Sequence, residues 1–131
     1  MTRTSVLIVE DNGLLAGELQ LVADEHGLLA KEPAHSYLAA LKAIDAGGFD
    51  CCVLDLNLGK FTADPFGPGR EGRQLLALLG TKKIPTVVYS GHVSEEKTIR
   101  ALHPDAVCID KLESCERVVE ALLELCCDAE T

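Results

Sequence analysis

The chain has 131 residues and carries 21 acidic against 12 basic side chains, for a formal net charge of -9. This length allows one domain with a buried core, and is too short for that domain plus a separate nucleic-acid-binding domain. The acidic balance argues against nonspecific nucleic-acid binding, because a phosphate backbone is held by Lys and Arg. We therefore expect a single domain over residues 1–131 that makes its contacts with proteins.

Apolar runs with strand character alternate with helical patterns through the first half of the chain. The expected elements, in chain order, are a strand at 5–9, a helix at 12–26, a strand at 28–32, a helix at 36–46 and a strand at 50–54. The second strand is the weakest, because Lys31 and Pro33 make it short and edge-like. The third is almost wholly apolar, as a central parallel strand should be.

The alternation continues through the second half. The expected elements are a helix from Glu71 that Gly80 ends, a strand opened by Pro85 and running to Tyr89, a helix capped by Ser94, a strand at 106–109 and a helix at 113–127. Strands that alternate with helices in this way predict an α/β fold. We expect a doubly wound, five-stranded parallel sheet with helices on both faces.

Polar side chains follow the strands where each strand ends. They are Glu10 and Asp11 after the first strand, Asp55 after the third, Ser90 and Gly91 after the fourth, and Lys111 after the fifth. The carboxyl ends of parallel strands face one crevice, so these side chains should converge although they are far apart in sequence. The converging set contains three carboxylates, a hydroxyl and an ammonium.

This set of side chains indicates phosphoryl transfer. Three crowded carboxylates raise one another's pKa unless a divalent cation neutralises them, and hard oxygen ligands suit Mg²⁺. A cation, an ammonium and a hydroxyl would surround a phosphoryl group placed on one carboxylate. We expect Asp55 to be the acceptor, because it lies alone at its strand end. Glu10 and Asp11 are adjacent and better placed to hold the metal.

At these residues the chain resembles the receiver domains of two-component response regulators, from Ser5 to about Leu125. The resemblance implies a flavodoxin-like, CheY-like fold and a phosphoprotein that binds Mg²⁺. It also implies roles for individual residues. These are Asp55 as phosphoacceptor, Glu10, Asp11 and Asp55 as metal ligands, Asn57 as a backbone-carbonyl ligand, Ser90 with Gly91 as the hydroxyl that closes on the phosphoryl oxygens, and Lys111 as the lysine that pairs with them.

The resemblance further implies a partner and a mechanism. A histidine kinase or histidine phosphotransfer protein would donate the phosphoryl group, and phosphorylation would change the face built by helix four, strand five and helix five. We expect a stand-alone, single-domain response regulator, monomeric or weakly dimeric. It would not be an enzyme beyond weak self-dephosphorylation.

The chain departs from the family pattern at several positions. Receiver domains carry an acidic residue and a glycine much closer to the phosphoacceptor than Glu71 and Gly72 are, so residues 59–70 resemble an insertion. It is either a tolerated surface loop or a flap anchored by two phenylalanines. Cys108 stands where the family usually has an aromatic switch residue. Leu112 replaces a proline after Lys111, which disfavours a cis peptide bond there. Two residues beyond Ser90, His92 could tune attack by water on the phosphoryl group.

The six cysteines favour free thiols in a reducing cytoplasm. Neighbouring strand residues point to opposite faces, so Cys51 and Cys52 cannot enter one site, and no Cys-x-x-Cys pair is present for zinc. No apolar segment is long enough to be a signal peptide or to cross a membrane, so we expect a cytoplasmic protein. The histidines at 26, 35 and 103 lie apart from the strand ends and indicate no role.

Two other functions remain open. A phosphorylation-independent receiver could keep the fold as an interaction module, as Cys108 and the insertion would allow. A phosphatase could use Asp55 as its nucleophile, but such enzymes usually need a second aspartate two residues later, where this chain has Asn57.

Overall fold

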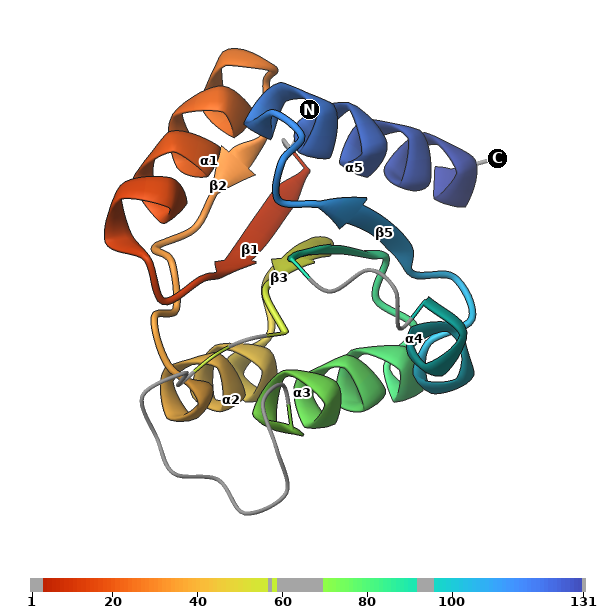
Figure 1. Ribbon diagram of the computed structural model, residues 1–131. Helices are drawn as coiled ribbons and strands as arrows, with labels where there is room; N and C mark the ends of the chain where they lie inside the picture. Colours follow the sequence, from red (N-terminus) through yellow and green to blue (C-terminus); the bar gives the residue numbers. More distant parts are fainter. Residues whose placement is uncertain (1–3, 57, 59–69, 92–95, 131) are drawn as a thin grey trace.

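The computed structural model describes residues 4–56, 58, 70–91 and 96–130. Its strands are β1 (Ser5–Val9), β2 (Leu29–Ala30), β3 (Cys51–Leu54), β4 (Thr86–Ser90) and β5 (Val107–Asp110). Its helices are α1 (Gly13–Glu25), α2 (Tyr37–Ala46), α3 (Arg70–Thr81), α4 (Glu96–Leu102) and α5 (Cys115–Glu130). The five strands form one parallel sheet in the order β2-β1-β3-β4-β5 (Figure 1). The expected α/β fold is therefore confirmed.

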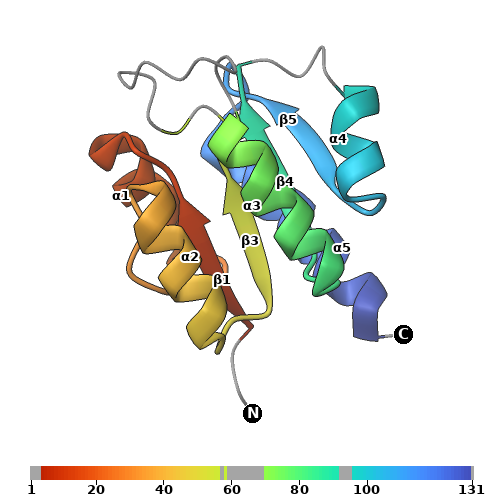
Figure 2. The same cartoon turned by 90° about the horizontal axis from the view of Figure 1, so that it is seen from below.

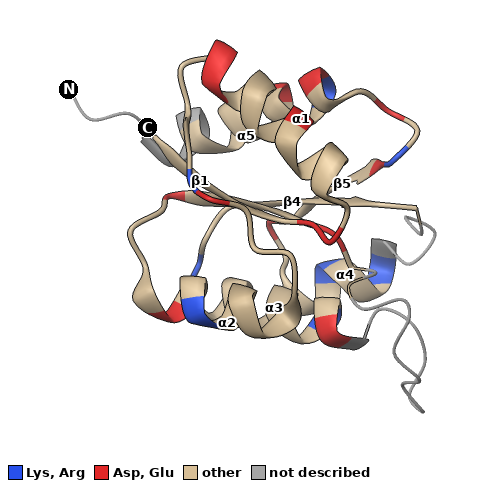
Figure 3. Ribbon diagram, turned by 90° about the vertical axis from the view of Figure 1, so that its left-hand side faces the viewer, with Lys and Arg blue, Asp and Glu red and all other residues tan. Residues whose placement is uncertain are grey.

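The helices cover both faces of the sheet. Helices α1 and α5 lie on one face, and α2, α3 and α4 lie on the other, with the sheet between them (Figure 3). In Figure 2 the strand arrows point the same way, so the carboxyl ends of all the strands share one edge. The chain leaves β1 toward β2 on one side and returns to β3 on the other. The carboxyl ends of β1 and β3 therefore mark the switch point of the sheet.

Two apolar clusters fill the space between the sheet and its helices, because alternate strand residues point to opposite faces. Val6 and Ile8 belong to the cluster under α1 and α5, whereas Leu7 and Val9 belong to the cluster over α2, α3 and α4. The cysteine pair divides in the same way. Cys51 lies in the first cluster and Cys52 in the second, as the sequence predicts.

The first two helices begin at side-chain caps. The side chain of Asn12 accepts hydrogen bonds from the backbone N–H groups of Leu14 and Leu15, at 3.0 and 3.3 Å, so α1 begins one residue later than expected. Ser36 caps α2 through the N–H of Ala39, at 3.1 Å. Strand β2 has only two residues and lies at the sheet edge, so its predicted position and weakness hold but its predicted length was too great.

The prediction that Gly80 ends the third helix was wrong. Helix α3 continues to Thr81, and Gly80 lies inside it. A β-carbon at Gly80 would come within 2.7 Å of the carbonyl oxygen of Leu102, so a glycine allows the end of α4 to approach closely. The left-handed residue after the helix is Lys83, with φ of 57°.

Gly72 allows another close approach. A β-carbon there would lie 2.3 Å from the carbonyl oxygen of Leu56, just beyond β3. The start of α3 therefore packs directly against the backbone of Leu56, the residue that follows Asp55. Across the described ranges, no helix has both the length and the apolarity needed to cross a membrane.

Candidate functional site

Backbone pairing sets the positions of Glu10 and Asp55. Val9 and Leu54 are opposite each other in the β1–β3 ladder, so the next residue of each strand leaves the sheet at the same level. The N–H of Asp55 donates to the carbonyl of Val9 at 2.9 Å, and the N–H of Glu10 donates to the carbonyl of Ala34 at 3.0 Å. Both carboxylates therefore project from a fixed backbone at the switch point.

Three carboxylates meet there. Glu10, Asp11 and Asp55 each offer an oxygen, and these oxygens lie within 4.8 Å of one another. The side chains of Glu10 and Asp55 are buried, at 1% and 2% exposed. Oδ1 of Asp11 is also buried and has no hydrogen-bond partner among the described residues. A set of hard oxygen donors with one buried oxygen unsatisfied fits a divalent cation such as Mg²⁺.

Lys111 brings a positive charge to the acidic cluster. It follows β5, and its Nζ lies 2.8 Å from Oε1 of Glu10 and 2.9 Å from Oδ2 of Asp55. Burial by itself lowers the pKa of Lys111. Hydrogen bonds to the two carboxylates and their charges outweigh burial, so the net shift is upward and the ammonium stays charged.

The electrostatics of Glu10 follow from the same contacts. Burial raises the pKa of Glu10 to about 7, against the opposing effect of the hydrogen bond from Lys111. The charge of Asp55 raises it further. One lysine does not balance three carboxylates, so without a cation the cluster tends to keep a proton.

Ser90 ends β4 at the same edge of the sheet. It is fully buried and pairs in register with Asp110, and its carbonyl accepts the N–H of Lys111 at 3.2 Å. Gly91 follows and is exposed, with open space where a β-carbon would be. The structure therefore brings Glu10, Asp11 and Asp55 close together, places Lys111 in contact with Glu10 and Asp55, and holds Ser90 against the backbone of Lys111.

Several predicted features lie outside the described residues. These are Asn57, His92, Ser94 and the stretch from Gly59 to Gly69, including both phenylalanines of the proposed flap. Cys108 is described. It is half-buried on β5 and packs against the cluster over α2, α3 and α4. Leu112 is 95% exposed, and the described residues contain no cis peptide bond.

Sequence reasoning set His35 apart from the strand ends, and this was wrong. Its Nδ1 lies 2.9 Å from the carbonyl oxygen of Glu10. An isolated bridge between Val9 and Ala34 brings the β2–α2 connection to the end of β1. His35 therefore contacts the backbone of a cluster residue. The signal that could have placed it was its position just after Pro33 and Ala34, where the chain passes the end of β1.

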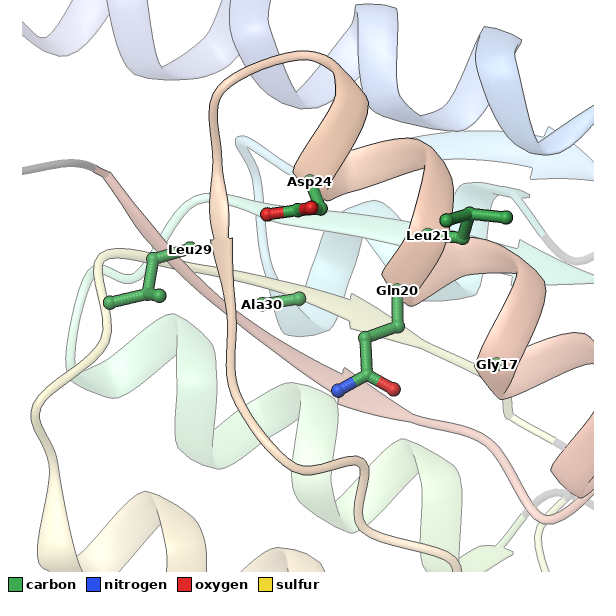
Figure 4. A pocket seen from close by; sticks show the side chains of 6 residues that line it. All are labelled: Gly17, Gln20, Leu21, Asp24, Leu29 and Ala30. Carbon is green, nitrogen blue, oxygen red and sulfur yellow. The ribbon is translucent and has the colours of Figure 1, made fainter.

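A hollow of about 420 Å³ lies between α1 and β2 (Figure 4). Its lining residues are Gly17, Gln20, Leu21, Asp24, Leu29 and Ala30. In Figure 4, Gln20 and Asp24 extend from α1 beside the β2 segment. None of the carboxylates of the cluster lines this hollow, so it is separate from the strand-end site.

Residues 6–123 match the family model of the response regulator receiver domain. The match covers most of the chain, so the chain belongs to the response regulator receiver domain family. This is a family of signalling phosphoacceptor domains of two-component systems. A search of the curated proteins found no match.

Solved structures share the fold. A CheY-like receiver domain protein from Methanospirillum hungatei JF-1 is 20% identical with a TM-score of 0.74, over 94% of this chain and 93% of that one. The receiver domain of a putative LuxO repressor protein from Vibrio parahaemolyticus is 17% identical with a TM-score of 0.78, over 98% and 94%. A Burkholderia pseudomallei response regulator, solved with a phosphorylated aspartic acid, calcium ion and citrate, is 24% identical with a TM-score of 0.73, over 91% of this chain and 66% of that one.

Proposed function

We propose that this protein is a single-domain response regulator whose Asp55 accepts a phosphoryl group from a histidine kinase or a histidine phosphotransfer protein. The observation that carries the proposal is the contact of Lys111 with both Glu10 and Asp55, at 2.8 and 2.9 Å, beside a buried Asp11 oxygen without a partner. One carboxylate thus has an ammonium beside it and two further carboxylates that would hold a cation. An ammonium and a cation are the positive charges that a dianionic phosphoryl group needs.

The reaction is a displacement at phosphorus. A carboxylate oxygen of Asp55 forms the new bond while the bond from phosphorus to the donor's imidazole nitrogen breaks, and that nitrogen keeps the electron pair. Lys111 then turns its ammonium from the Asp55 carboxylate to a phosphoryl oxygen. Ser90 donates its hydroxyl to another phosphoryl oxygen, and the following Gly91 leaves room for that approach.

Glu10, Asp11 and Asp55 would hold Mg²⁺, with the backbone carbonyl of Asn57 as a further ligand. Bound there, the cation would neutralise charge on the carboxylates and on the incoming phosphoryl oxygens. The unsatisfied Oδ1 of Asp11 supports a cation at this place, because it is an oxygen ligand without a donor in the described part of the chain. The raised pKa of Glu10 supports it too, since burial and then the charge of Asp55 disfavour its ionised form unless a cation is near.

The output would be a protein contact. Phosphorylation would shift the population of the face formed by α4, β5 and α5, in a cytoplasmic protein that is monomeric or weakly dimeric and does not bind nucleic acid. Cys108 lies on that face in place of an aromatic residue, so its side chain and that of His92 are candidates for tuning the switch and its weak self-dephosphorylation.

Mass spectrometry tests the proposal. Incubation with Mg²⁺ and acetyl phosphate should add one phosphoryl group, about 80 Da, to the wild-type protein. Asp55→Asn should remove the gain, and Asp45→Asn, which changes an exposed aspartate of α2, should keep it. A gain that persists in Asp55→Asn would move the phosphoacceptor elsewhere.

No gain in the wild type, with acetyl phosphate or with a donor kinase, would favour the phosphorylation-independent interaction module. Binding of Mg²⁺ separates the two as well, because a module without phosphoryl chemistry has no need to keep a cation site.

A further inference from the structure

The turn after β5 carries Lys111 and is closed by Asp110. The N–H of Glu113 donates to the Asp110 carbonyl at 2.9 Å, and the N–H of Leu112 donates to Oδ1 of Asp110 at 2.8 Å. Leu112 itself is 95% exposed, so its side chain does not anchor the turn in the core. The position of this turn against the sheet must therefore come from other contacts.

Tyr89 supplies one of these contacts. It is the penultimate residue of β4, 3% exposed, and its side chain belongs to the cluster under α1 and α5. Its hydroxyl reaches the carbonyl oxygens of Lys111, at 3.4 Å, and of Glu113, in a shorter contact. A phenol has one proton to donate, so the closer carbonyl of Glu113 is the main acceptor.

Among the described residues, the backbone hydrogen bonds give the carbonyl of Glu113 no other donor. The first backbone bond of α5 runs from Val118 to Ser114, one residue after Glu113, so the helix ladder does not use this carbonyl. Burial raises the pKa of Tyr89 to about 12, and the phenol therefore stays protonated and able to donate at physiological pH.

Strand β4 thus holds the turn at two successive residues. Ser90 accepts the backbone N–H of Lys111 at 3.2 Å, and Tyr89 donates to the carbonyls beyond it. The other end of Lys111 lies between Glu10 and Asp55. A long lysine side chain loses much conformational freedom when its ammonium is fixed, so a fixed backbone at its base reduces that cost.

We propose that Tyr89 is a positioning residue for Lys111: its hydroxyl fixes the Asp110–Glu113 turn against β4, and so holds the ammonium of Lys111 between Glu10 and Asp55. For its consequence in phosphoryl transfer, this inference rests on the proposed function. Leu112 is exposed and stands where the family usually has a rigid proline, so neither burial nor a proline ring fixes this turn. The hydrogen bond from Tyr89 fixes it instead.

Hydrogen exchange of the Lys111 ammonium, followed by ¹⁵N NMR at mildly acidic pH and low temperature, tests the inference without any phosphoryl donor. Lys111→Met identifies the resonance by its loss. Tyr89→Phe keeps the buried ring and removes only the hydroxyl. Tyr37→Phe, which changes the other tyrosine of the chain on α2, is the matched control.

We expect a slowly exchanging Lys111 signal in the wild type and in Tyr37→Phe. In Tyr89→Phe the exchange rate should rise about fivefold, which is the effect of losing one ordinary hydrogen bond. Equal exchange in the wild type and Tyr89→Phe would overturn the inference, and so would the absence of a protected Lys111 signal in the wild type.

Labelling with acetyl phosphate then gives the consequence for function. In a protein that keeps Lys111, Tyr89→Phe should slow the labelling of Asp55 about fivefold. In a protein that already carries Lys111→Met, adding Tyr89→Phe should not slow the labelling further. Equal slowing in both backgrounds would overturn the positioning role, because a general loss of stability does not depend on Lys111. A wild-type protein that takes no label counts against the proposed function alone and leaves the exchange comparison intact.

Discussion

The ammonium nitrogen of Lys111 lies 2.9 Å from Oδ2 of Asp55, although 56 residues separate the two in the chain. Glu10 contacts the same ammonium, and Asp11 lies beside both carboxylates. The cluster therefore holds three acidic groups and one basic group. Its surplus negative charge determines how the metal-free protein should respond to substitution and to pH.

Asp55→Asn should raise the melting temperature of the metal-free protein by a few degrees. The substitution removes one of three crowded carboxylates, and the charge of Asp55 is one cause of the raised pKa of Glu10. Lys111 keeps its contact with Glu10. Thermal unfolding in the presence of a chelator measures the change, with the exposed Asp45→Asn as control. An unchanged or lower melting temperature would contradict repulsion within the cluster.

The metal-free protein should lose stability as pH rises from about 4.5 to about 7. Glu10 has an ordinary pKa of 4.5, and burial raises it to about 7 in the folded protein. Between these values the unfolded chain has lost the proton and the folded protein keeps it. The free energy of unfolding therefore falls with pH, by at most about 1.4 kcal/mol per unit from this group, and levels off above the folded pKa.

Urea unfolding at several pH values, with a chelator, checks this slope. Asp11, Asp55 and Lys111 face Glu10, so the quantity to compare is the difference between the wild type and Glu10→Gln. The variant should lack this part of the slope. Added Mg²⁺ should reduce the slope in the wild type, because a cation favours ionised Glu10. If the difference in the free energy of unfolding between the wild type and Glu10→Gln did not change with pH, the pKa of Glu10 in the folded protein would not be raised.

Gly72→Ala should destabilise the protein by about 3 kcal/mol. Its β-carbon would lie 2.3 Å from backbone atoms of Leu56, and backbone cannot yield as a flexible side chain can. Gly17→Ala is the matched control, because Gly17 lies exposed in α1 with open space at its β-carbon.

The control should stabilise the protein by about 1 kcal/mol, since alanine is the better helix former. Urea unfolding of both variants gives the two values. If Gly72→Ala were as stable as the wild type, the start of α3 would not rest on the end of β3.

The thiols of Cys51 and Cys52 should react slowly with a disulfide reagent in the folded protein. Both are fully buried, and their pKa values are raised, that of Cys51 chiefly by its contact with Cys126 and that of Cys52 by burial. Urea should bring both into the fast phase. In the double variant with alanine at both positions, the slow phase of the thiol reaction should lose two thiols and the fast phase should stay the same. A smaller fast phase would show that Cys51 or Cys52 is accessible in the folded protein.

The cluster could be predicted from sequence because parallel strands share an edge. Glu10 and Asp55 follow an apolar run directly, and Lys111 follows one after a single residue, so the strand pattern alone places them together. The expected opposite orientation of Cys51 and Cys52 followed from the same two-residue period. These predictions needed the strand ends and no knowledge of the loops.

Contacts made by connections could not be predicted in this way. His35 reaches the Glu10 carbonyl through a bridge between Val9 and Ala34, in a stretch with no strand pattern. Gly80 was expected to end α3, because glycine often follows a helix, yet it lies inside α3 and allows the end of α4 to pack closely. In both cases a tertiary contact decides the outcome, and the periodicity of the local sequence does not indicate that contact.

The contact of Lys111 with Glu10 and Asp55 also has a consequence for folding. The three residues come from the ends of β1, β3 and β5, and β4 separates the last two strands in the sheet. Non-local pairings of this kind form only after long loops have closed. The ion pairs can therefore exist only when four of the five strands have docked in register. Any signal that depends on Lys111 at Asp55 is thus also a measure of the fraction of molecules in which these four strands are assembled.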